Sequence, residues 1–145
     1  MKVSVASLAV VAIASLGSLA VWAQGTSSQW DGIYTVDQAM RGEKLYQEKC
    51  SVCHGSDVLG TEMAPSLSGG EFSKNWDDLS IGDLFELIHT AMPQNDPGTL
   101  STQQVADILA FMLSKGQYQP GQTELPAKAE QLKAIKFLAK NPKAK

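Results

Sequence analysis

The sequence predicts an all-α fold, and two observations carry that prediction. Three stretches repeat apolar residues at intervals of three and four, and each opens with a hydroxyl residue followed three positions later by an acidic or amide residue, as in a helix capping box. No useful length of chain alternates between apolar and polar residues, as a half-exposed strand would. We therefore expect three core helices joined by long loops at residues 55–79 and 92–100.

The first predicted helix begins after Thr35, whose capping partner is Gln38. Its less polar positions recur every three or four residues and are expected to form one buried face. That spacing predicts that this helix delivers two cysteines toward its buried side. The face consists of Ala39, Gly42, Tyr46, Cys50 and Cys53.

The second predicted helix begins after Ser80 and carries leucine and isoleucine at helical spacing. Pro93 ends it, because proline lacks the N–H that a helix interior requires. The third begins after Ser101 and closes at Gly116. Pro126, followed by apolar residues at positions 132, 135 and 138, predicts a further amphipathic helix near the C-terminus.

The N-terminus has the composition of an export signal. A single positive charge at Lys2 precedes an apolar run that ends in Val21-Trp22-Ala23, with small residues where a signal peptidase reads. We expect cleavage before Gln24 and a periplasmic protein. The alternative is an uncleaved membrane anchor, because the run approaches the ~20 residues that span a bilayer.

Beyond this signal peptide at 1–23, the length fits a single domain. We expect an N-terminal leader at 24–34, polar and flexible through Gln29, a core domain at 35–116 and a C-terminal extension at 117–145.

Both cysteines of the chain lie in the sequence Cys50-Ser51-Val52-Cys53-His54, a C-x-x-C-H box. Thiols spaced this way on a helical turn can each add to one vinyl group of a porphyrin, and the histidine that follows can ligate the iron. The box therefore predicts one covalent haem c.

Other uses of the box carry less support. A redox-active dithiol usually follows a strand, whereas a helix is expected before Cys50. Structural zinc needs about four ligands, and His89 is the only histidine outside the box. A plain disulfide between Cys50 and Cys53 would leave His54 without a role.

The iron has a second axial position, for which a methionine sulfur is the expected ligand. Met40 and Met112 fall inside predicted helices and are expected to pack. Met92 stands where the second helix ends, with a proline directly after it, so the backbone can hold a weak ligand in place. This favours Met92 over Met63, His89 or an open position.

From Trp30 to Gly116 the chain resembles a monohaem class I cytochrome c. The resemblance rests on the box, on Ala64-Pro65-Ser66-Leu67 and on Met92-Pro93. Smaller details, such as Trp30-Asp31-Gly32-Ile33-Tyr34, are similar to cytochromes that accompany or are fused to quinoprotein (PQQ) alcohol dehydrogenases.

The resemblance implies the cytochrome c fold around a covalent haem. It also implies that Gly42 lets the first helix cross closely over the last, where Phe111 would meet Tyr46. The Pro65 carbonyl would accept a hydrogen bond from His54 and fix its tautomer.

An iron bound by both His54 and Met92 has no free position, which argues for a one-electron carrier and against an enzyme. We expect it to accept electrons from a dehydrogenase, with a quinoprotein as one candidate, and to pass them to an oxidase or another cytochrome. The alternatives are a haem subunit of a quinoprotein dehydrogenase complex, and a haem peroxidase or ligand sensor. Membrane association is expected only if the signal segment is retained.

Charge is unevenly distributed along the chain. Residues 24–126 carry 14 acidic and 5 basic side chains, whereas residues 127–145 carry 6 lysines and a single glutamate. The acidic body argues against nucleic-acid binding. The lysine-rich end has three open interpretations: it packs on the acidic body, docks on a partner dehydrogenase, or frays from Asn141 onward.

Overall fold

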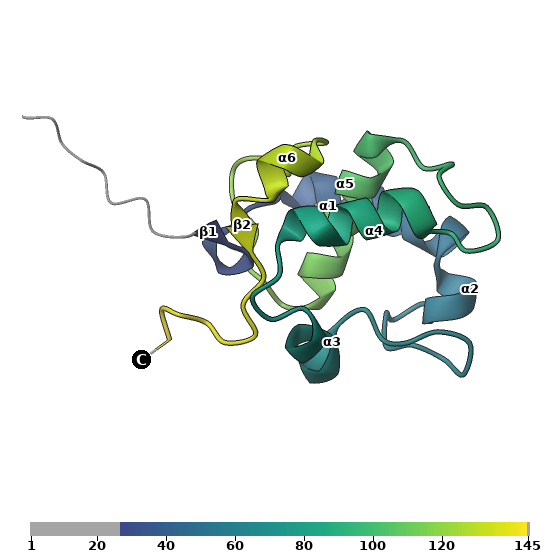
Figure 1. Ribbon diagram of the computed structural model, residues 1–145, viewed down its shortest axis with the longest axis horizontal. Helices are drawn as coiled ribbons and strands as arrows, with labels where there is room; N and C mark the ends of the chain where they lie inside the picture. Colours follow the sequence, from purple (N-terminus) through teal and green to yellow (C-terminus); the bar gives the residue numbers. More distant parts are fainter. Residues whose placement is uncertain (1–26, 145) are drawn as a thin grey trace, which may run out of the picture.

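The computed structural model describes residues 27–144, so the expected signal peptide lies outside the described residues. The fold is mostly helical, and Figure 1 shows its elements. Within residues 27–144, no helix has both the length and the apolar content needed to span a bilayer. In chain order the elements are β1 (Ser27–Ser28), the 3-10 helix η1 (Gln29–Asp31), α1 (Val36–Lys49), α2 (Ser51–His54), α3 (Gly69–Asn75), α4 (Ile81–Ala91), α5 (Thr102–Lys115), α6 (Ala129–Leu132) and β2 (Ile135–Lys136).

The three predicted core helices are present as α1, α4 and α5. Each begins at its predicted cap: the side chains of Thr35, Ser80 and Ser101 accept hydrogen bonds from backbone N–H groups in the first turn. These bonds satisfy N–H groups that have no partner within the helix, so the chain starts each helix at one defined residue.

Helices α1 and α5 cross at very short range. A Cβ atom on Gly42 would lie 1.8 Å from the carbonyl oxygen of Asp107, so only glycine allows the two backbones to approach this closely. Next to this contact the Tyr46 and Phe111 rings pack with their centroids 5.0 Å apart. The close crossing and the aromatic pair are therefore confirmed, and they set the position of the C-terminal end of α1.

One helix boundary differs from the prediction, and one helix was not predicted. The first helix does not run through to Cys53; it ends at Lys49, and Cys50 leaves the helical conformation before the single turn of α2 begins. The predicted loop at 55–79 contains α3, in which Phe72 is buried. Apolar periodicity did not reveal α3 because its seven residues make only about two turns.

Residues 117–144, here called the C-terminal strap, return across the domain to the N-terminus. The predicted C-terminal helix is only one turn long, α6, and Ile135 beyond it lies in extended backbone paired with Ser27. Phe137 is buried and exchanges backbone hydrogen bonds with Asp78 and Leu79. Pairing with these distant segments satisfies the strap backbone without a longer helix.

The prediction of a flexible leader is wrong for Ser28 and Gln29, both of which are buried. The Gln29 side chain donates to the Leu138 carbonyl at 2.6 Å and accepts from the Leu138 N–H at 2.9 Å. Gln38 on α1 does the same for Leu125, at 3.0 and 2.8 Å. Two buried glutamines therefore clamp the strap by its main chain.

Arg41 adds a third anchor to the strap. Its guanidinium donates to both carboxylate oxygens of Asp107 on α5 and to both of Glu124 on the strap, over 2.8–3.1 Å. The two carboxylates raise the pKa of Arg41, so it stays charged. The network ties α1, α5 and the strap together at one point.

Strap lysines also pair with acidic residues of the body. Lys133 lies 3.0 Å from Glu86, Lys136 lies 3.2 Å from Asp78, and Lys143 contacts Asp31. Of the three interpretations of the lysine-rich end, the structure supports packing on the acidic body.

Replacing Gln38 with leucine tests the strap clamp. The change leaves the buried N–H and C=O of Leu125 without partners, and we expect it to lower the free energy of unfolding by about 2 kcal/mol. Denaturant titration of the intact protein measures the loss, and hydrogen exchange should show faster exchange near residue 125. Gln131→Leu, at an exposed position on α6, is the control; equal loss in both variants would contradict the clamp.

Candidate haem attachment site

Cys50 precedes the single helical turn of α2 as its N-cap, and Cys53 lies on that turn three residues later. The N–H groups of Cys53 and His54 both donate to the Cys50 carbonyl, at 3.2 and 3.0 Å. Residues three apart on such a turn project to the same side. Both side chains are half-buried free thiols, and burial raises the pKa of Cys50 to about 11. The turn thus presents two sulfur atoms in the arrangement that two adjacent vinyl groups require.

His54 is oriented by a backbone contact. Its Nδ1 lies 2.8 Å from the Pro65 carbonyl oxygen, as the resemblance implies. A carbonyl can only accept, so Nδ1 carries the proton and Nε2 keeps its lone pair for a metal. The imidazole is therefore already in the tautomer that iron ligation through Nε2 needs.

The loop after the box folds back over it. The Gly60 N–H donates to the His54 carbonyl at 2.9 Å, and the Tyr46 hydroxyl donates to the Gly55 carbonyl at 2.7 Å. Gly60 has a φ of +83°, and a Cβ there would lie 2.6 Å from the Ser66 nitrogen. Burial raises the pKa of Tyr46, which keeps its hydroxyl protonated as a donor. These contacts fix the turn that carries the cysteines and histidine.

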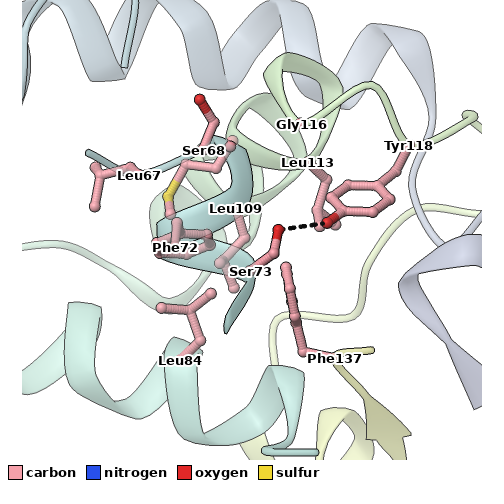
Figure 2. Close-up of a pocket in the computed structure, with 12 residues that line it drawn as sticks. Leu67, Ser68, Phe72, Ser73, Leu84, Leu109, Leu113, Gly116, Tyr118 and Phe137 are labelled. Carbon is pink, nitrogen blue, oxygen red and sulfur yellow. Dashed lines mark hydrogen bonds between the residues drawn. The ribbon is translucent and has the colours of Figure 1, made fainter. Parts of the chain in front are cut away.

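An apolar pocket lies beside the loop that carries Pro65 (Figure 2). Leucine and phenylalanine side chains from the loop, α3, α4, α5 and the strap face one another across it, and the Ser73 and Tyr118 hydroxyls are 3.3 Å apart at its margin. Cys50, Cys53, His54 and Met92 are not among the residues that line it, so this pocket is a gap in the apolar core outside the box. The apolar residues are Leu67, Phe72, Leu84, Leu109, Met112, Leu113 and Phe137.

The candidate sixth ligands have different surroundings. Met92 is half-buried, caps the C-terminal end of α4 through its N–H to Ile88, and packs against the core. Met112 is buried in α5, whereas Met63 and Met40 are 70% and 57% exposed. Met92 is thus the half-buried methionine at a helix end, and its ligation of iron stays a prediction.

Together these residues fit a covalent haem c. The thiols of Cys50 and Cys53 would hold its edge, and His54 would ligate the iron through Nε2. Sequence reasoning missed Gly60 and Thr61, which brace the box, because their partners are main-chain atoms that no side-chain pattern reports.

Comparison with known proteins gives a family. Residues 37–112, which hold α1, the box, α4 and most of α5, match the family described as "Cytochrome C oxidase, cbb3-type, subunit III". The match covers the box and Met92 and ends within α5, before the strap.

Two individual proteins are similar to the chain. A curated relative named thiosulfate dehydrogenase, from Psychrobacter arcticus, is 30% identical in a 99-residue alignment that covers 60% of this chain and 30% of the relative. A solved structure, the sulfane dehydrogenase SoxCD from Paracoccus pantotrophus, is 21% identical with a TM-score of 0.49, over 74% of this chain and 61% of that one. The chain therefore spans less than a third of the curated relative's length.

Proposed function

The chain belongs to the cytochrome c family described as cbb3-type subunit III, which carries covalent haem c and reacts with redox protein partners, and from this premise we propose that it is a periplasmic one-electron carrier. Its iron is held by His54 and Met92. The observation that carries this proposal is the 2.8 Å contact between His54 Nδ1 and the Pro65 carbonyl, which leaves Nε2 free for iron.

Saturated ligation makes the protein a carrier. Bound haem c supplies a one-electron couple, and a histidine–methionine pair leaves no position for oxygen, peroxide or substrate. The residues around it then have only to hold the two ligands, exclude water and keep the geometry unchanged between oxidation states. Methionine ligation and burial of the haem both favour a high reduction potential.

A dehydrogenase is the proposed electron donor, and an oxidase or another cytochrome is the proposed acceptor. Two candidate classes of donor follow from different observations. The sequence details at Trp30–Tyr34 are similar to cytochromes of quinoprotein alcohol dehydrogenases, whereas the curated relative is named thiosulfate dehydrogenase. Purified enzymes of both classes can be compared directly by the rate at which each reduces the holoprotein.

Replacing Met92 with alanine tests the sixth ligand. We expect the sulfur–iron band in the near-infrared to disappear, the reduction potential to fall by at least ~100 mV because a soft ligand is lost, and carbon monoxide to bind the reduced protein rapidly. The matched control is Met40→Ala, on an exposed face of α1, which should keep the band.

Two outcomes would contradict Met92 ligation. If Met63→Ala removed the band and Met92→Ala kept it, the ligand would be misassigned. If the native protein lacked the band and bound carbon monoxide at once, the alternative of a haem enzyme or ligand sensor would replace the carrier.

Export is proposed from residues 1–23, and mass spectrometry of the purified protein tests it. A mature chain that begins at Gln24 would support cleavage and periplasmic release. A chain that still begins at Met1 and sediments with membranes would support the anchored alternative.

A further inference from the structure

The most exposed apolar side chains of the described residues gather beside the box. Val52 is 76% exposed, Met63 is 70% exposed and Leu59 is 63% exposed, more than any other large apolar side chain in residues 27–144. Single exposed apolar residues are ordinary on a protein surface, but a cluster marks an interaction site. None of the three belongs to the core.

Hydrogen bonds brace the backbone of the segment that carries these side chains. The Thr61 hydroxyl donates to the Cys53 carbonyl, next to Val52, and the Met63 N–H donates to Thr61 Oγ1 at 3.0 Å. The Leu59 N–H donates to Asp57 at 3.1 Å. A surface already ordered before binding loses little conformational entropy when a partner arrives, which suits a brief encounter.

The same segment is acidic. Between residues 48 and 63 the charged side chains are Glu48, Asp57 and Glu62 against Lys49 alone. Lys49 is already paired with Glu48, at 3.0 Å. We name this surface the box face. Its apolar centre consists of Val52, Leu59 and Met63, and its acidic residues are Glu48, Asp57 and Glu62.

Basic charge lies elsewhere on the molecule. The strap lysines flank α6 or lie in β2 and the residues after it, and Figure 1 shows α2 and β2 toward opposite ends of the long axis. Three of these lysines are paired with body carboxylates. The segment that holds the box thus keeps a net negative charge away from the strap lysines, and this arrangement orients encounters before contact.

We infer that the box face docks a redox protein whose own contact surface is an apolar patch ringed by lysine or arginine. The inference rests on the proposed function, because it places the partner where the covalent haem edge is held. Charge complementarity selects this partner over a second copy of the chain, whose box face would carry the same negative charge. The small apolar centre fits a weak, short-lived redox complex.

Electron transfer from the reduced, full-length holoprotein tests the inference. The probe is a purified cytochrome c with lysines around its haem edge, and ferricyanide serves as a small anionic reagent. With the lysine-ringed probe we expect the double variant Asp57→Asn/Glu62→Gln to react about tenfold more slowly at low salt, and added salt to slow the native protein. With ferricyanide the same variant should react faster, because negative charge has been removed.

The apolar centre and the controls complete the design. Val52→Ser/Met63→Ser should slow the reaction with the lysine-ringed probe and leave the ferricyanide rate unchanged. Val36→Ser/Met40→Ser, exposed apolar residues on α1, and Lys128→Gln/Lys140→Gln, exposed strap lysines, should match the native protein with the lysine-ringed probe.

Three results would overturn the inference. The box-face variants could react with the lysine-ringed probe at the native rate, or the reaction could be slowed only in the strap variants. Sedimentation could also show salt-dependent self-association of the protein through the box face. In each case normal reaction with ferricyanide would leave the carrier function standing. Failure of the native protein to exchange electrons with either reagent would refute the proposed function itself, and the inference with it.

Discussion

Alanine at position 42 is expected to lower the free energy of unfolding by about 3 kcal/mol or more. The added Cβ would lie 1.8 Å from the Asp107 carbonyl oxygen and 2.4 Å from its carbonyl carbon. Overpacking usually costs about 1–3 kcal/mol. Here the obstacle is backbone in the middle of α5, which cannot rotate away, so α1 and α5 must separate and the Tyr46–Phe111 contact must loosen.

Gly70→Ala is the matched control for this prediction. A Cβ at Gly70 meets nothing within 4 Å, and the position lies at the start of α3. That variant should be neutral or slightly more stable, because alanine favours the helix and restricts the unfolded chain. The measurement is the denaturant midpoint of unfolding of each holoprotein variant. Equal midpoints for Gly42→Ala and Gly70→Ala would show that the crossing of α1 and α5 tolerates a side chain.

Removing both thiols, as Cys50→Ala/Cys53→Ala, is expected to abolish covalent attachment completely. Both thioether bonds are lost, so any pigment that remains should extract into acidified acetone, and a denaturing gel stained for haem should show no band. We also expect a large loss of folded protein, because a domain of this size buries a modest core and would lose a large apolar group from it.

Ser51→Ala tests whether the loss of covalent haem is caused by removal of the cysteine sulfur atoms. Ser51 lies inside the same turn, and its hydroxyl donates only to the Gln47 carbonyl, at 2.6 Å. This variant should keep haem that resists extraction. A native protein whose pigment washes out in acid, or a double variant that still stains, would refute thioether attachment.

The parts of the site that the sequence predicted are those encoded locally. The box is five consecutive residues, and one helical turn brings its two thiols to the same side. The caps at Thr35, Ser80 and Ser101 are equally local, because each side chain bonds its own helix within three residues. The contact of His54 with Pro65 came from the resemblance, since no physical rule links residues 11 positions apart in a loop.

The parts that could not be predicted depend on distant main-chain partners. Gln29 and Gln38 look like ordinary surface residues in the sequence, yet their partners lie 109 and 87 positions away. The box face was also missed, because exposure of Val52, Leu59 and Met63 depends on how the loop folds over α2. Tertiary contacts decided both, and short-range patterns do not report them.

The glutamine clamps determine which substitutions, insertions and deletions the strap can accept during evolution. Gln29 and Gln38 bond the amide groups of Leu138 and Leu125, which every residue except proline presents in the same way. Exposed strap positions are therefore free to diverge, whereas a single inserted or deleted residue between the two clamps would shift Leu132 and Phe137 out of their places. The number of strap residues between the clamps is therefore constrained, whereas the identity of the exposed strap residues is not.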